Sequence, residues 1–297
     1  MATKQRLLWI DWMKVIAMYL IIAGHCNVPG NKYIYVFSVP CFFILSGFLT
    51  KRESDIRVFW GKILWNLVVP MGLLFCVNVL FSGFLHYLHG DLHFDFLWRM
   101  PLNALLGFQG EDLSAGGLGA LWFVYTLVLC RIILQFTPHK REITTLTLLN
   151  VVMLIGAIII NKHQFRIYSS FANVLLSMPF FTIGYFIRPM KAKLETLRPS
   201  WLLMIMVVGI VGVWLCGRFN DIVYLYCCSY GSSILLCFLG AVSGTATVYA
   251  ISMLLKSQLA DFVRVTGGGY THNPWSSHYC YTSVVYGCPY PWNMALC

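Results

Sequence analysis

Residues 8–27 read LWIDWMKVIAMYLIIAGHCN, an apolar stretch long enough to cross a bilayer as one helix. A membrane span needs about 20 predominantly apolar residues, and runs of this kind recur along most of the chain. They lie near residues 8–27, 33–50, 63–86, 119–137, 143–160, 170–188, 200–217 and 226–255. The sequence therefore predicts an all-α fold, a polytopic transmembrane helix bundle with eight readable spans.

The composition agrees with a protein that lives in a membrane. Of the 297 residues, 59% are hydrophobic and only 11% are charged, whereas about a quarter of the residues in an average soluble domain are charged. The net charge is +10, but the basic residues form short clusters between apolar runs, which is typical of topology signals. We therefore expect contact with membrane lipids and no nucleic acid as a partner.

The basic clusters also predict the orientation of the chain. We interpret the first apolar run as a retained helix, because it carries ionisable residues and lacks a small-residue cleavage site. Placing the N-terminus in the cytoplasm leaves few basic residues outside, namely Lys32, Arg99, Lys162, Arg166 and Arg218. The cytoplasmic side then holds Lys4, Arg6, Lys51, Arg52, Arg57, Lys62, Lys140, Arg141, Arg188, Lys191, Lys193, Arg198, Lys256 and Arg264. The positive-inside rule favours this orientation over its inverse.

Three ionisable residues, Asp11, Lys14 and His25, share the first span. At 100° per residue they project within about 60° of one another, and Asp11 and His25 lie about 21 Å apart along the helix. Charged side chains are costly inside a bilayer, so such a stripe is expected to face the bundle interior or a wet cavity and to be functional. The alternative is that Asp11 and Lys14 neutralise each other near the interface and leave His25 as a lone residue.

Two ordered motifs resemble the acyltransferase 3 family. The family's first helix has an isoleucine–aspartate pair, a basic residue three positions later and a histidine eleven residues after that, matched by Ile10-Asp11, Lys14 and His25. Its second signature, a proline and paired phenylalanines leading to Ser-Gly, is matched within residues 39–49. Residues 121–123 and 178–185 resemble motifs of the fucose 4-O-acetylase-like branch. A lysine at position 14, where arginine is usual, and a missing Arg-x-x-Arg before Pro70 also fit that branch.

The resemblance implies a membrane-bound O-acyltransferase of about ten spans in the bacterial cytoplasmic membrane. It would transfer acetyl from cytoplasmic acetyl-CoA to a hydroxyl of a cell-surface or lipid-linked carbohydrate. His25 would act as the general base for that hydroxyl or as a covalent acyl carrier, two roles that the sequence leaves open. Lys14 would bind the donor's phosphates or stabilise the oxyanion, and Asp11 would orient Lys14.

Three further residues are candidates for binding. Arg131 either snorkels to the interface or lines an entrance for coenzyme A. Trp122 and Phe123 either pack at an interface or stack on the acceptor sugar. Ser46 lies in no G-x-S-x-G elbow, so we expect close helix packing from it and not nucleophilic catalysis.

We expect no metal. The eleven cysteines show no CxxC or Cys/His spacing, and the His89 and His93 pair has no third ligand placed with it. The alternative function is a transporter or flippase for a glycan or lipid precursor, because many helices with an intramembrane charged stripe also describe such proteins. Matched broken segments in two repeats, a common sign of transporters, are not evident.

The chain divides into an acyltransferase 3-like domain at residues 1–264 and an atypical polar tail at residues 265–297. A ninth span is expected after Arg264, but the tail offers no apolar run of that length. Read one nucleotide later, codons for residues 270–280 permit an apolar stretch such as Ile-Leu-Gly-Leu-His-Ile-Ile. We interpret the tail as a frameshifted end, which predicts a truncated chain with little activity.

Overall fold

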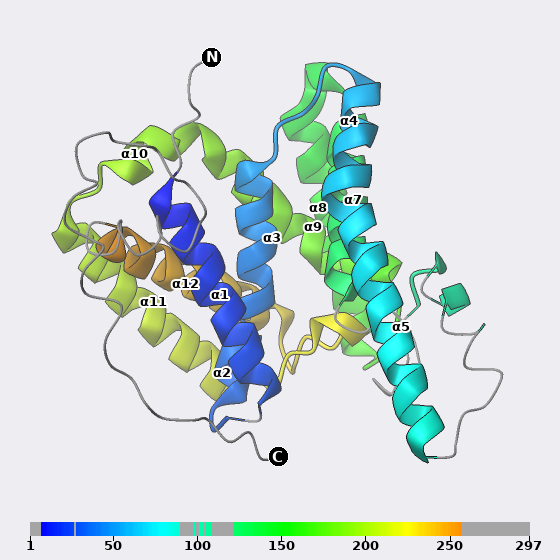
Figure 1. Cartoon of the computed structure of the whole chain (residues 1–297). Coiled ribbons are helices and arrows are strands. Elements are labelled where there is room, and N and C mark those ends of the chain that lie inside the picture. The colour runs from blue at the N-terminus through cyan, green and yellow to red at the C-terminus, as the bar shows by residue number, and fades with distance from the viewer. Residues whose placement is uncertain are drawn as a thin grey trace, which may run out of the picture. The chain divides into compact units, whose positions relative to one another are not determined.

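A computed structural model describes residues 7–26, 28–89, 98, 101–103, 105–108 and 121–256, and helices dominate this part of the chain (Figure 1). The all-α prediction is confirmed. Within these residues seven helical segments are long and apolar enough to cross a membrane, and Trp122–Phe136 is a shorter apolar helix at the fourth predicted span, 119–137. The tail at residues 265–297 lies outside the described residues, so the expectation of about ten spans stays a prediction.

The helices follow the predicted spans closely. In chain order they are α1 (Leu8–His25), α2 (Asn31–Tyr35), α3 (Ser38–Leu49), α4 (Ile56–Ile63), α5 (Val69–His89), α7 (Trp122–Phe136), α8 (Glu142–Lys162), α9 (Ser170–Ile187), α10 (Lys191–Glu195), α11 (Pro199–Phe219) and α12 (Ile234–Leu255). A π-helical segment, Leu64–Val68, joins α4 to α5 without a loop. The third helical segment therefore starts before the predicted residue 63.

The last predicted span, 226–255, begins too early. The helix starts only at Ile234, because residues 220–233 form a compact loop around the side chain of Asn220. Its Oδ1 accepts hydrogen bonds from the Ser233 amide (2.8 Å) and the Ser232 hydroxyl (3.0 Å), and its Nδ2 donates to the Tyr230 carbonyl (3.1 Å). These bonds satisfy polar groups that an apolar setting would otherwise leave unpaired.

Helices α3 and α9 touch through their backbones. A Cβ atom added at Gly47 would collide with the Phe181 carbonyl, and one added at Gly184 would collide with the Ile44 carbonyl. Small residues permit this approach, and close packing replaces the hydrophobic effect as the cause of helix association in a bilayer. Gly47, the residue after Ser46, thus lies at a helix contact.

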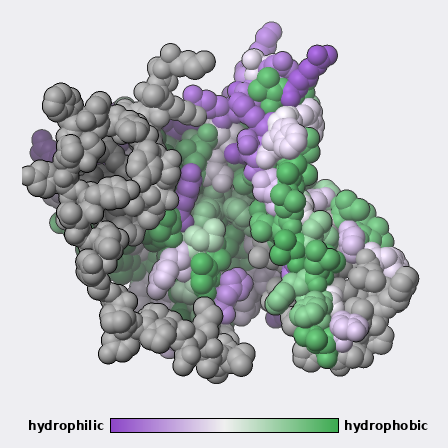
Figure 2. All heavy atoms as spheres, viewed as in Figure 1, coloured by the Kyte–Doolittle hydropathy of each residue, from purple (hydrophilic) through white to green (hydrophobic). Residues whose placement is uncertain are grey.

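Some apolar helix faces are buried in the core of the bundle, and others are exposed on its surface. Trp9, Met13 and Ala17 of α1 are buried against α3 and α12, whereas apolar residues of the opposite face, such as Met18 and Ile22, are exposed. Hydrophobic residues also cover the visible face of α5, and hydrophilic residues gather where α4 begins (Figure 2). Such exposed apolar faces are what a lipid environment requires.

The loops and helix ends form two groups, and we call the end at which α1 begins the basic end. Contacts between Trp9 and Glu195, Thr50 and Arg188, Arg52 and Glu142, and Lys256 and Glu195 hold this end together. Its described basic residues are Lys51, Arg52, Arg57, Lys62, Lys140, Arg141, Arg188, Lys191, Lys193, Arg198 and Lys256. At or near the opposite helix ends lie Lys32, Lys162, Arg166 and Arg218. Lys4, Arg6, Arg99 and Arg264 lie outside the described residues.

Candidate functional site

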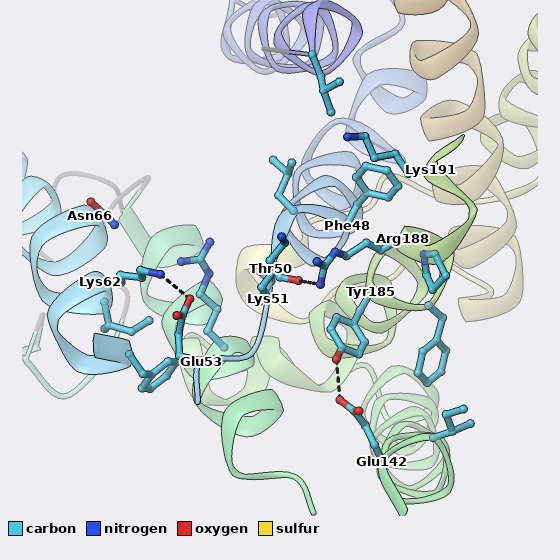
Figure 3. A pocket seen from close by; sticks show the side chains of 18 residues that line it. Phe48, Thr50, Lys51, Glu53, Lys62, Asn66, Glu142, Tyr185, Arg188 and Lys191 are labelled. Carbon is cyan, nitrogen blue, oxygen red and sulfur yellow. Dashed lines mark hydrogen bonds and ion pairs between the residues drawn. The ribbon is translucent and has the colours of Figure 1, made fainter. Parts of the chain in front are cut away.

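A cavity of about 1050 Å³ opens at the basic end (Figure 3). Small-molecule sites usually have volumes of about 300–1,000 Å³, so the cavity has room for a large ligand. Its wall combines the ends of α3, α4, α7, α8 and α9 with the loop after α3. Among the described residues that line it, five are basic and two are acidic, namely Lys51, Lys62, Arg131, Arg188 and Lys191 against Glu53 and Glu142. The cavity is therefore suited to an anion.

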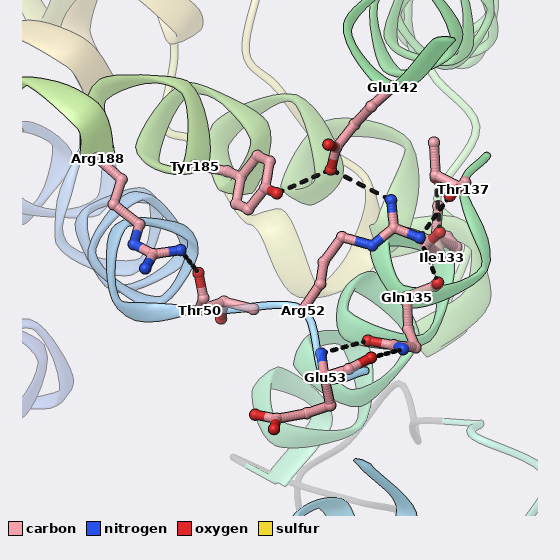
Figure 4. A network of polar contacts seen from close by, with 9 residues as sticks. All are labelled: Thr50, Arg52, Glu53, Ile133, Gln135, Thr137, Glu142, Tyr185 and Arg188. Atoms are coloured by element: carbon pink, nitrogen blue, oxygen red, sulfur yellow. Dashed lines mark hydrogen bonds and ion pairs between the residues drawn. The ribbon is translucent and has the colours of Figure 1, made fainter. Parts of the chain in front are cut away.

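The loop after α3 is fixed beside this cavity by Arg52, whose side chain is only 10% exposed. Arg52 forms an ion pair with Glu142 (Nη1 to Oε1, 3.3 Å), and its Nη2 donates to the backbone carbonyls of Gln135 (2.7 Å) and Thr137 (Figure 4). Tyr185 donates to the same Glu142 oxygen at 2.8 Å. The network joins α7, α8 and α9 to the loop, so it sets the shape of the cavity wall.

Replacing Arg52 by alanine is expected to destabilise the protein by roughly 1–3 kcal/mol, the usual effect of lost bonds to a charged group. The measurement is thermal unfolding of the detergent-solubilised protein. Arg57 provides the matched control, since its side chain is exposed in the next helix. If Arg52→Ala and Arg57→Ala unfold at the same temperature, the network does not fix the loop.

The basic side chains in the cavity wall differ in their partners. Lys62 forms an ion pair with Glu53 at 2.7 Å, and Arg188 donates to the Thr50 carbonyl at 3.1 Å. The buried Nε of Arg131 has no hydrogen-bond partner within the part of the chain that the structure describes. Buried polar groups are nearly always paired, so an unpaired one in a cavity indicates a place for a ligand or water. The structure thus places Arg131 in the wall of the anion-suited cavity.

The predicted stripe on α1 is not part of this cavity. Asp11 and Lys14 form an ion pair of 3.9 Å with side chains 21% and 49% exposed, the arrangement of the alternative interpretation. His25 is exposed in the last turn of α1, at the opposite end of the bundle. Within the described residues Lys14 and His25 are exposed, as are Met18 and Ile22 on the same helix, whereas Asp11 is partly buried. That the stripe faces the bundle interior or a wet cavity stays a prediction. The structure does not bring His25 together with Lys14.

The end of α1 that carries His25 is nevertheless held in place. The Asn31 side-chain amide and the Tyr35 hydroxyl both donate to the Gly24 carbonyl at 2.9 Å. Carbonyls at a helix C-terminus have no partner within the helix, so these bonds replace the missing ones. The position of His25 therefore depends on α2 as well as on α1.

Trp122 and Phe123 lie in a packed aromatic cluster near the start of α7. Trp122 is buried, with its ring centroid 6.5 Å from that of Phe43. Phe123 packs against Phe43 at 4.7 Å and Phe42 at 5.7 Å. Neither residue lines the basic-end cavity. In the structure both rings therefore pack against phenylalanines of α3, and a role in stacking on the acceptor sugar stays a prediction.

Within the described residues, neither cysteine thiols nor metal-binding side chains form a functional site besides the basic-end cavity. These contain no group of three His, Cys, Asp or Glu residues placed to hold a metal ion, and His93 lies outside them. Cys228 lies between α11 and α12, where its Sγ donates to Asn173 at 3.3 Å. Burial raises the pKa of the Cys228 thiol to about 11, so this thiol is protonated at neutral pH and is a poor nucleophile.

Sequence reasoning missed most of the residues that line the cavity. It singled out Arg131, because a charged residue within an apolar run is unusual. The orientation argument used Lys51, Arg188 and Lys191 only as basic residues of one side of the membrane. No network was predicted between Arg52, Glu142 and Tyr185. The sequence did contain one signal for the cavity. A basic residue lies next to the end of each of two helices, Lys51 after α3 and Arg188 after α9.

Comparison with known proteins agrees with the resemblance. A family model described as an acyltransferase domain, that of acyltransferase 3, matches residues 7–255. Searches of curated proteins and of solved structures found no match. The matched residues include α1, α3 and all the residues that line the basic-end cavity. The chain belongs to the acyltransferase 3 family and is a multi-pass membrane acyltransferase.

Proposed function

We propose that the basic-end cavity binds the phosphorylated part of acetyl-CoA, and that the protein transfers the acetyl group to a carbohydrate hydroxyl. The cavity carries this proposal, because an excess of basic side chains around a volume of about 1050 Å³ suits a large anionic donor. The positive-inside rule supports a cytoplasmic location for this end, where acetyl-CoA is available. Lys14 does not line the cavity, so the proposed phosphate contacts are Lys51, Arg131, Arg188 and Lys191.

His25 is the proposed group for the acceptor side. The acceptor is a surface polysaccharide or a lipid-linked glycan whose hydroxyl needs a base before it can attack. In the overall reaction the thioester C–S bond breaks and an ester C–O bond forms, and the proton that His25 takes from the hydroxyl is passed through water to the departing thiolate. The cavity and His25 lie at opposite ends of the bundle, so the acyl group must travel between them. His25 then serves either as base or as acyl carrier.

Reversing the charge of the cavity wall tests the donor site. Lys191→Glu is expected to raise the KM for acetyl-CoA about tenfold or more, since charge-assisted contacts contribute roughly 1.5–3 kcal/mol. The wild-type KM should also rise with salt, because partly exposed charges are screened. Lys193→Glu is the matched control, since Lys193 is exposed on the same helix and does not line the cavity. Equal effects of the two substitutions would contradict the assignment.

Two measurements test the activity itself. Mass spectrometry of cell-surface glycans with and without the gene should reveal one acetyl mass on a sugar when the gene is present. Membranes that contain the protein should release coenzyme A from acetyl-CoA when the acceptor is added. A transporter or flippase would leave the second signal at background, and that outcome would favour the alternative.

The remaining parts of the proposal are the fucose 4-O-acetylase-like branch, a bacterial cytoplasmic membrane with the N-terminus inside, and a frameshifted tail. The family match ends at residue 255, which supports a change of character in the residues that follow. Reporter fusions to the loops at each end test the orientation. Sequencing the gene around the codons for residues 265–269 tests the frameshift, and an intact frame in independent clones would refute it. A restored frame is expected to give higher acetyl release than this chain.

A further inference from the structure

A second, smaller cavity of about 180 Å³ lies between α1, α3, α9 and α12. Its wall includes Trp9, Met13, Leu45 and Phe48, and Tyr249 and Thr245 contribute from α12. The polar atoms of this wall are engaged elsewhere. Thr245 donates to the Ala241 carbonyl (2.8 Å), Tyr249 to the Leu194 carbonyl (2.7 Å) and the Trp9 indole to Glu195 (3.3 Å). The cavity thus presents hydrocarbon, a lining that excludes water and accepts apolar ligands.

The apolar cavity adjoins the basic-end cavity. Phe48 lines both of them, and it lies beside Lys191 and Arg188 in Figure 3. Along α9 and the turn after it, Ile187 lines the apolar cavity and Arg188 the basic one. A ligand with an anionic head and a short hydrocarbon chain would therefore occupy both cavities at once. An acyl-CoA has such a head and such a chain, and the pantetheine arm that joins them would have to lie folded within the larger basic-end cavity.

We infer that the apolar cavity receives the acyl chain of the donor and that the protein therefore also accepts donors with acyl chains longer than acetyl. The inference rests on the proposed donor site in the basic-end cavity. An apolar cavity of about 150 Å³ holds a benzene ring, so 180 Å³ has room for an acyl group of about six carbons. An acetyl group would leave most of this volume unfilled. Each further methylene that enters the cavity is expected to improve affinity about fourfold, equivalent to about 0.8 kcal/mol.

Equilibrium binding of a chain-length series tests the inference on the full chain in nanodiscs. The ligands are coenzyme A and its acetyl, butyryl, hexanoyl and octanoyl thioesters. Four added methylenes at about fourfold each would raise affinity by up to about 250-fold from acetyl to hexanoyl. A rise of at least tenfold, followed by a plateau, is the expected result. Equilibrium binding can be measured whether or not this chain is catalytically active, so the test does not depend on its activity.

Two substitutions change the cavity in opposite directions. Ala246→Leu fills part of the space and is expected to remove the gain from acetyl to hexanoyl while leaving the affinity for coenzyme A unchanged. Ile183→Ala enlarges the space and is expected to extend the gain to octanoyl. Ala192→Leu is the control, because it adds the same atoms to an exposed position that lines neither cavity.

The outcomes separate the inference from the proposed function. Failure of coenzyme A itself to bind would refute the donor site. Normal binding of coenzyme A with no gain along the series would overturn the acyl-chain inference alone. A gain that persists in Ala246→Leu would come from partition into the bilayer and would also overturn it. Native mass spectrometry provides a further outcome. If a phospholipid co-purifies with the wild type but not with Ala246→Leu, and affinity does not rise along the series, the cavity binds lipid and the acyl-chain inference is overturned. If Ala246→Leu fails to fold, Ile183→Ala decides.

Discussion

Replacing Gly184 by alanine is expected to separate α3 from α9 and to leave little folded protein. The new Cβ atom would collide with the backbone carbonyl of Ile44, which cannot turn aside as a flexible side chain can. Overpacking typically costs about 1–3 kcal/mol, and a collision with backbone lies at the upper end of that range or above it. The measurement is thermal unfolding, together with the yield of monodisperse protein in detergent.

Gly72 provides the control for this prediction. It lies in α5, where no atom of the described part of the chain comes within 4 Å of an added Cβ atom. Alanine there is expected to be neutral or slightly stabilising, because glycine is about 1 kcal/mol less favourable than alanine within a helix. Equal unfolding temperatures for Gly184→Ala and the wild type would show that the backbone contact between α3 and α9 does not hold the bundle together.

Replacing His25 by alanine is expected to lower acyl transfer by a factor of about 10² to 10⁴, the usual contribution of a general acid–base residue. His25 is exposed and lies far from the basic-end cavity, so the unfolding temperature and the affinity for coenzyme A are expected to stay unchanged. The assay follows acetyl transfer from labelled acetyl-CoA in membranes. It uses either this chain or its restored frame, whichever has the higher activity.

His163→Ala serves as the control for the histidine. Its ring is exposed and stacks on Phe165 with centroids 5.4 Å apart. The control is expected to retain activity. Full activity of His25→Ala, with the protein folded and donor bound, would remove His25 from the mechanism. The acceptor side of the reaction would then have to be assigned to other residues.

The helical spans could be predicted because each is encoded locally. A run such as residues 200–217 contains its own signal, the length and hydropathy that a bilayer demands. The start of α12 could not be placed this way, since Ser233 caps it and the amide of Ser233 is in turn bound by Asn220, at the far end of the preceding loop. From local composition, Tyr226 and Cys227 were predicted to belong to the last apolar span, whereas in the structure they lie in a separate turn, Leu225–Cys227.

The candidate site was predicted less completely than the fold, for the same reason. Arg52 and Glu142 are 90 residues apart, and nothing in either segment indicates the other as a partner. The cavity likewise combines short pieces of several helices, so it exists only after packing. Hydropathy and motif spacing identified α1 as important, but they could not show that the stripe with Lys14 and the cavity with Lys51 lie apart.

The backbone contact at Gly47 and Gly184 also bears on how the donor is held. No side chains lie between α3 and α9 at this contact, so the two helices are expected to behave as one rigid body. The loop after α3 carries Lys51, and α9 leads directly into Arg188. Two of the proposed phosphate contacts are therefore preorganised at a fixed separation. Binding then loses little conformational entropy on that side of the donor, and adjustment to different donors falls to the side formed by α4.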